Sequence, residues 1–119
     1  RMVAAINSAR EHDGLPPLHT ARELQRSAGA FARWLLHNQT LSHRPNVSTT
    51  RRYPHSGEAL SMHFSLRARV SATMHAWLAS ASHRALVLTQ SMDRVGIGHA
   101  RGRYRGRART VWVVQVARR

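Results

Sequence analysis

The chain opens with a pattern of apolar residues that predicts a short helix. Met2, Val3 and Ile6 recur at helical spacing, and the pattern stops at Gly14 and the proline pair that follows it. Glycine and proline end helices because glycine readily adopts left-handed backbone angles and proline lacks the next amide donor. We therefore predict a helix over residues 2–11.

A longer amphipathic helix is predicted to begin near Ala21. Thr20 and Glu23 have the spacing of a capping box, in which two side chains accept hydrogen bonds from the free amides at a helix start. Arginines and a histidine fill the opposite side, so only one face of this helix can be buried. That face comprises Ala21, Leu24, Ala28, Phe31, Ala32 and Leu35.

The middle of the chain has weaker patterns. Residues 39–53 are rich in Ser, Thr, Asn, Pro and Arg without periodicity, which predicts a long loop. Residues 56–60 are predicted to form a short strand. Ser65 is placed to cap a helix over residues 66–79, and a serine at position 80 or 82 is placed to begin a further short helix that ends near Leu88.

The end of the chain changes from helical to alternating spacing. Val95, Ile97 and His99 alternate with small residues, and residues 111–116 are apolar at nearly every position, as in a strand covered from both sides. These two strands are predicted to form a hairpin. Helices followed by a terminal hairpin indicate an α+β fold, with a small antiparallel sheet between helices, in one domain spanning residues 1–119.

Composition narrows the chemistry and the partners. The chain has no cysteine, which excludes disulfides, thiolate metal sites and a cysteine nucleophile. It has 19 basic and 5 acidic residues, a formal charge of +14, and every basic residue is arginine. Such a charge attracts polyanions, whether nucleic acid, anionic lipid head groups or acidic wall polymers. No apolar stretch is long enough to span a membrane.

Four separated segments together resemble the CAP (SCP-like) family in its cysteine-free bacterial form. The segments follow the family's order and span almost the whole chain. The resemblance implies a three-layer α-β-α sandwich and secretion, and we expect an export signal upstream of Arg1. The segments are Asn7-Ser-Ala-Arg10 with Gly14-Leu15-Pro-Pro-Leu18, Leu41-Ser42-His43, Gly57-Glu58-Ala59-Leu60, and Trp77-Leu-Ala-Ser80-Ala-Ser82-His83-Arg84 with Val95-Gly96-Ile97-Gly98.

The same resemblance implies a cleft formed by His43, Glu58 and His83. A second cleft glutamate found in many relatives is replaced here by Ser80, so the usual four-residue constellation is reduced to three. The chain also departs from the family where Ala59 replaces asparagine, Ser82 replaces glycine, and Thr89-Gln90 replaces an Asn-Pro pair.

Two imidazoles and one carboxylate match the three protein ligands of an open zinc site, so a divalent cation such as zinc, or a small ligand, is one hypothesis for this cleft. The alternative is structural, with Glu58 accepting hydrogen bonds that hold the surrounding loops together. Ser42, Ser80 and Ser82 lie near histidines in sequence, which keeps a serine-type or metal-assisted hydrolase as an alternative. Two of these serines are explained as helix caps, and we assign no catalytic residue.

Arginine occupies every second position from residue 101 to residue 109. In an extended strand this spacing predicts that all five guanidinium groups share one face, where they would bind an anion or be solvated. The five residues are Arg101, Arg103, Arg105, Arg107 and Arg109.

The sequence thus predicts a non-enzymatic binding domain, extracellular or at the cell envelope. Its expected ligands are a lipid, a small apolar molecule or an anionic envelope polymer. Nucleic-acid binding through the arginines is a further hypothesis, although the chain has no recognised nucleic-acid motif and few aromatic residues beyond Tyr104 among the arginines.

Overall fold

The structure is a computed structural model that describes residues 2–42, 55–63 and 81–118, without the side chains of residues 55–63 and 81–83. It contains three described helices and four strands. In chain order they are α1 (Met2–His12), β1 (His19–Thr20), α2 (Arg22–His37), β2 (His55–His63), α5 (Ala81–Val87), β3 (Arg94–Tyr104) and β4 (Arg107–Arg118).

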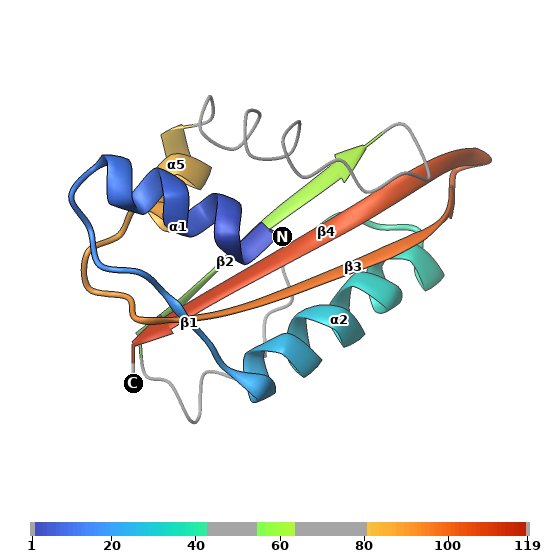
Figure 1. Ribbon diagram of the computed structural model, residues 1–119. Coiled ribbons are helices and arrows are strands. Elements are labelled where there is room, and N and C mark those ends of the chain that lie inside the picture. Colours follow the sequence, from blue (N-terminus) through green and yellow to red (C-terminus); the bar gives the residue numbers. More distant parts are fainter. Residues whose placement is uncertain (1, 43–54, 64–80, 119) are drawn as a thin grey trace.

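The strands form one sheet in the order β1-β3-β4-β2. β4 pairs antiparallel with both β3 and β2, and β1 adds a two-residue parallel pair at the edge of β3. Helices α1 and α5 cover one face of the sheet and α2 covers the other (Figure 1). The predicted α+β fold, with its sheet between helical layers, is confirmed, while the short parallel strand was not predicted.

The central strand β4 is buried on both faces. Trp112, Val114 and Val116 pack toward α1 and α5, whereas Val111 and Val113 pack against α2. Side chains alternate along a strand, so a strand covered on both sides must be apolar at odd and even positions alike. This explains the apolar run, interrupted at Gln115 alone, that predicted the strand.

Helix α2 buries the predicted face but begins differently from the prediction. Leu24, Phe31 and Leu35 are all buried. The prediction of a capping box is wrong, because the N-cap residue is Ala21, which makes no side-chain cap hydrogen bond. Thr20 lies in β1 opposite Val95, and the amide of Ala21 donates to the Val95 carbonyl at 2.9 Å. Strand pairing therefore extends to the residue where the helix begins.

The small residues that alternate along β3 allow α2 to approach the sheet. A Cβ atom added at Gly96 would overlap the backbone of Leu24, and one added at Gly98 would overlap the backbone of Ala28 and Gly29. Any side chain at either glycine would push the helix outward. The glycines thus set the spacing between α2 and the sheet.

The structure describes the remaining predicted elements only in part. The strand predicted over residues 56–60 is confirmed within β2, and the short helix before Leu88 is confirmed as α5. The helix predicted over residues 66–79, and most of the loop predicted over residues 39–53, lie outside the described residues. None of the described helices is both long enough and apolar enough to cross a membrane.

Candidate functional site

The three residues of the predicted cleft are described only in part. His43 lies outside the described residues, and the side chains of Glu58 and His83 are not described. The backbone of Glu58 lies in β2 opposite Gln115, and His83 lies in α5, which contacts β2. Among the described residues no three metal-ligating side chains come together. The cleft therefore stays a prediction.

Of the candidate serine nucleophiles, Ser42 is the one whose side chain is described. It is exposed, and its hydroxyl lies 3.3 Å from the hydroxyl of Thr40.

Asn7 and Arg10, from the opening motif, join α1 to the segments around it. The Asn7 amide donates to the Leu18 carbonyl at 3.1 Å, and its oxygen accepts from the Leu18 amide at 2.8 Å. Asn7 thus binds the backbone of Leu18 as a neighbouring strand would. Sequence reasoning used this motif only as a family marker and missed its structural role.

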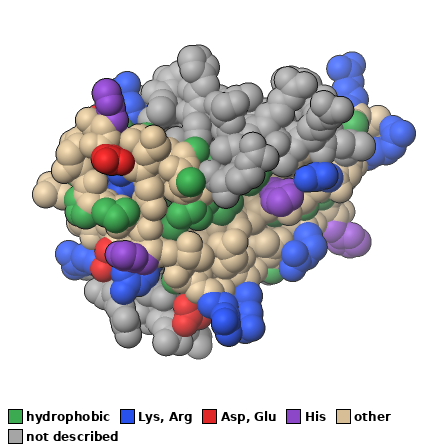
Figure 2. Space-filling view, in the orientation of Figure 1, with side chains coloured by type: hydrophobic (Ala, Val, Ile, Leu, Met, Phe, Trp, Pro, Cys, Tyr) green, Lys and Arg blue, Asp and Glu red, His purple; other side chains and the backbone are tan. Residues whose placement is uncertain are grey.

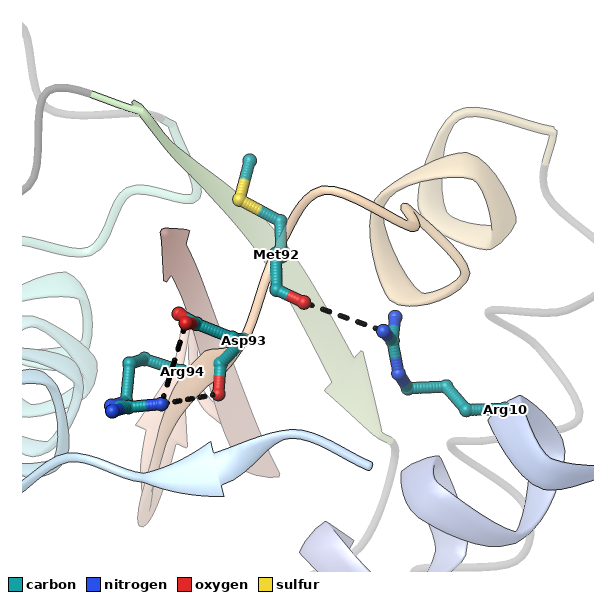
Figure 3. A network of polar contacts seen from close by, with 4 residues as sticks. All are labelled: Arg10, Met92, Asp93 and Arg94. Atoms are coloured by element: carbon teal, nitrogen blue, oxygen red, sulfur yellow. Dashed lines mark hydrogen bonds and ion pairs between the residues drawn. The ribbon is translucent and has the colours of Figure 1, made fainter. Parts of the chain in front are cut away.

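Arg10 is fully buried, with 0 % of its surface exposed. Its guanidinium donates to the carbonyls of Pro16 at 2.8 Å, Val87 at 3.0 Å, Thr89 at 2.9 Å and Met92 at 3.4 Å. Figure 3 shows the contact with Met92 beside the ion pair between Asp93 and Arg94. We call Arg10 and these four carbonyls the Arg10 clasp.

The Arg10 clasp joins α1, the loop after it and the connection from α5 to β3. Burial lowers the pKa of Arg10, because a charge out of water is destabilised. Carbonyl dipoles replace the lost hydration, which satisfies the guanidinium donors. The burial of Arg10 could have been predicted from the sequence, because Arg10 continues the apolar row of Met2 and Ile6 at intervals of four residues on one face of the helix.

A groove of about 840 Å³ lies between α1 and α5. Ala5 and Ala9 line its α1 side and Leu88 its α5 side, while His12 and Arg84 bring polar groups to it. Arg84 directly follows His83 of the predicted cleft in the sequence.

The arginine-rich segment forms the tip of the β3–β4 hairpin, and its turn separates the arginines. Tyr104 pairs with Arg107, so the turn consists of Arg105 and Gly106. Both turn residues have positive φ, 52° and 81°, as in the two-residue turns that join twisted strands. We call residues 101–109 the basic hairpin.

The prediction that all five arginines share one face is wrong. Arg101 is opposite Thr110 and Arg103 is opposite Ala108, whereas Arg109 is opposite Gly102. Residues opposite each other in a ladder share a face, and a two-residue turn pairs odd positions of one strand with even positions of the other. Arg101 and Arg103 therefore lie on the α1/α5 side of the sheet, and Arg107 and Arg109 lie on the α2 side.

Gln39 fixes the turn of the basic hairpin to the end of α2. Its amide nitrogen donates to the carbonyls of Leu36 at 2.7 Å and Arg103 at 2.8 Å, and its oxygen accepts from the Arg105 amide at 2.6 Å. Because Gln39 is 64 residues away from Arg103 in sequence, no local pattern could reveal this link.

The four carboxylates whose side chains the structure describes lie toward the opposite end of the sheet. Asp93 comes directly before β3, Glu23 lies in the first turn of α2, and Glu11 and Asp13 lie at the end of α1. From Asp93 to Arg101 an extended strand spans about 27 Å, several times the screening length of about 8 Å at physiological salt. The basic hairpin is therefore not neutralised by these acids. In the view of Figure 2 the red acidic groups lie on the left-hand side of the molecule, where blue groups lie beside them, and none is seen at the right-hand end.

His99 lies one step from the basic hairpin on the α1/α5 side. Its ring packs on Trp112 with 4.9 Å between centroids. Burial, and secondarily the charge of Arg101, lower the pKa of His99. Although His99 is exposed, its imidazole is thus protonated less readily than a free histidine next to this row of permanent charges.

Comparison with known proteins places these features in a family. The model of the cysteine-rich secretory protein (CAP) family matches residues 3–116. No curated protein sequence matches the chain. An outer surface protein from Borrelia burgdorferi has the same fold, with a TM-score of 0.79 and 21 % identity over 99 % of this chain and 90 % of that chain.

Two further solved structures share the fold. An extracellular protein containing an SCP domain from Bacillus anthracis has a TM-score of 0.79 and 19 % identity; the match covers 99 % of this chain but 39 % of that one. The crystal structure of NaASP2 with Zn²⁺ has a TM-score of 0.71 and 11 % identity over 97 % of this chain and 76 % of that one.

Proposed function

Because this chain belongs to the cysteine-rich secretory protein (CAP) family, we propose that it is a non-enzymatic extracellular domain that binds anionic envelope polymers through its basic hairpin. The observation that carries the proposal is the placement of five arginines at the end of the sheet away from the four described carboxylates. An extracellular location is supported by relatives described as an outer surface protein and an extracellular protein.

Binding by the basic hairpin has a clear physical basis. Arg101, Arg103, Arg105 and Arg107 are exposed, so their guanidinium groups can contact an anion without first unfolding the strand, whereas Arg109 is half-buried and donates to the Ala108 carbonyl at 3.0 Å. Guanidinium groups form paired hydrogen bonds with phosphate and carboxylate oxygens. A polymer that binds releases its condensed counterions, which makes the affinity depend steeply on salt.

The test is a salt titration of binding to a glycerol phosphate polymer, duplex DNA and anionic vesicles. The test variant replaces all five hairpin arginines by serine. One rigid duplex can reach at most the two arginines of one face and Arg105, so we expect the slope of log affinity against log salt for DNA to fall by about 3 units. The control variant has the same net charge and replaces Arg22, Arg26, Arg84, Arg94 and Arg118 instead.

The control variant should keep most of the slope, because its arginines lie outside the hairpin. Equal slopes for the test variant and the wild type with every polymer would contradict the proposal. Binding to vesicles alone would instead assign the basic hairpin to a membrane surface.

The predicted cleft supports a second candidate, a site for a divalent cation or small ligand at His43, Glu58 and His83. Two observations favour it: α5, which carries His83, contacts β2, which carries Glu58, and NaASP2 was crystallised with Zn²⁺. Zinc calorimetry on the wild type and on His83→Ala tests it. Affinity should fall in the variant and at acidic pH, because an imidazole must be neutral to bind metal. Equal affinity in both proteins would remove His83 from the site.

A further inference from the structure

We infer that the outer edge of β3, the edge away from β4, is a docking site for an extended acidic peptide that joins the sheet as a further strand. The inference goes beyond polymer binding by the arginine side chains and does not depend on it. It rests on the backbone of β3 between Ile97 and Arg103. Within the described part of the chain, β1 is the strand on this edge, and it pairs with Arg94 and Val95 alone.

The register shows which backbone groups of β3 point outward. Tyr104 and Arg107 close the two-residue turn, where the first carbonyl of a β-turn accepts from the fourth amide. Hydrogen-bonded pairs alternate along an antiparallel ladder, so the odd-numbered residues of β3 direct their amides and carbonyls away from β4. Two contacts agree with this. The Val95 carbonyl accepts from the amide of the α2 N-cap residue, and the Ile97 amide donates to the Gln25 side chain, each at 2.9 Å.

The middle of this edge is open. Gln25 occupies one end and Gln39, which binds the turn, occupies the other. Between them, no residue that the structure describes makes a hydrogen bond to the outward amides and carbonyls of His99 and Arg101. Both residues are exposed, as a chain docking here requires. An open edge of this kind is a template for pairing with another extended chain.

The open edge selects a peptide backbone rather than a polyanion. It offers amide donors and carbonyl acceptors in turn, with successive outward residues about 7 Å apart. A peptide strand presents the complementary donors and acceptors at the same repeat, which is the basis of recognition by strand addition. The phosphates of a polyanion offer acceptors but no donors, so they leave the carbonyls of β3 unpaired.

The side chains along the edge specify an acidic partner. His99, Arg101 and Arg103 form one row on the α1/α5 side of the sheet, and the residues opposite them in an added strand would share that side. On the α2 side a guanidinium nitrogen of Arg33 lies beside Gly29, where α2 touches β3. Acidic residues at every second position of a peptide would therefore pair with the row of cations.

The same charges disfavour a second copy of this chain. Two copies joined along β3 into one continuous sheet would place their arginine rows next to each other. Like charges opposite one another in a ladder are destabilising, and charged side chains on an edge strand protect proteins from such self-pairing. The arginines thus oppose self-association and attract an acidic strand.

The experiment measures binding of a fluorescent peptide of alternating glutamate and threonine, and of two N-methylated versions, by anisotropy. One version carries methyl groups on the glutamate nitrogens and the other on the threonine nitrogens, so charge and methyl content match. Only one set of nitrogens faces β3 in a given pairing. One version should therefore bind at least about tenfold more weakly than the other, because it has lost the donors that β3 accepts. Loss with methylated glutamate indicates antiparallel pairing, and loss with methylated threonine indicates parallel pairing.

A pair of protein variants tests the same contact from the other side. Arg101→Ser removes the charge alone, whereas Arg101→Pro also removes the outward amide and keeps the ladder to β4. The proline variant should bind the unmethylated peptide at least about threefold more weakly than the serine variant. Thermal melts check that both variants fold.

Equal affinities of the wild type for the two methylated peptides would overturn the inference, because the peptide would then bind by charge alone. This comparison uses unaltered protein, so it decides the question even where Arg101→Pro fails to fold. Dimerisation of the wild type through this edge, seen as a concentration-dependent mass in ultracentrifugation that Arg101→Pro abolishes, would also overturn it, since a second copy would then be the occupant.

Discussion

The two ends of the sheet use the same side chain in opposite ways. At one end Arg10 is fully buried and donates to four backbone carbonyls. At the other end the basic hairpin places five arginines at the surface, and among them Arg103 and Arg109 donate to carbonyls close by in sequence. Net charge therefore does not distinguish an arginine that stabilises the fold from one that is available to a ligand.

Desolvation explains the difference. A guanidinium is tolerated out of water only where hydrogen-bond acceptors replace its hydration. Substituting such an arginine then destabilises the fold strongly, because the acceptors lose their donor. An exposed guanidinium keeps its water and stabilises the fold little. The buried arginine is thus part of the fold, and the hairpin arginines can be changed without unfolding the protein.

The largest expected effect tests this contrast directly. Arg10→Ala should lower the free energy of unfolding by about 3–5 kcal/mol, the size of the loss when one partner of a buried charged contact is removed, because four carbonyls lose their donor at once. Arg107→Ala, at an exposed position, should change it by less than about 0.5 kcal/mol. Urea denaturation measures both, and similar losses for the two variants would abolish the distinction.

The apolar face of α2 should be nearly as important, since this helix supports the base of the basic hairpin. Phe31 is 3 % exposed and packs in one cluster with Val111 and Val113 of β4. Phe31→Ala should cost about 3–5 kcal/mol. Arg26→Ala, on the exposed side of α2, is the control for denaturation by urea. A loss below about 1 kcal/mol at Phe31 would mean that α2 does not hold this end of the sheet.

The close approach of α2 to β3 can be tested with two glycines of the same strand. Gly98→Ala should lower stability by about 3 kcal/mol, because the new Cβ overlaps the backbone of α2, which must shift. At Gly102 a Cβ would lie 3.3 Å from the end of the flexible Leu36 side chain, so Gly102→Ala should cost well under about 1 kcal/mol. Thermal melts compare the two, and equal costs would contradict the spacing role of Gly98.

The smallest expected effect concerns His99, between the core and the basic hairpin. Its native pKa is lowered by burial and by Arg101, so its contribution to stability is present above the ordinary value near 6.5 and is lost as pH falls through the native pKa. Arg101→Ser should raise the pKa of His99 toward its ordinary value. NMR titration of the imidazole measures this shift, with Arg107→Ser, on the other face, as the control. A pKa that stays unchanged in Arg101→Ser would show that burial alone lowers it.

Local patterns in the sequence determined most of the fold. The helical spacing of Leu24, Phe31 and Leu35 specified the buried face of α2, and the apolar run in β4 specified a strand covered on both sides. These patterns work because burial depends on which side of a helix or strand a residue occupies, and that side follows from spacing alone. The four separated motifs also indicated the family, and the match of the family model over residues 3–116 confirms it.

Contacts between distant segments decided the rest. Thr20 is a strand residue rather than a helix cap because it pairs with Val95. Arg10 is buried because it donates to carbonyls such as that of Val87, 77 residues away. The two-residue turn at Arg105 and Gly106 reversed the chain and divided one row of arginines between two faces. Spacing specifies the face of a side chain only within one continuous strand, whereas pairing across a turn or between segments depends on the register that the folded backbone adopts.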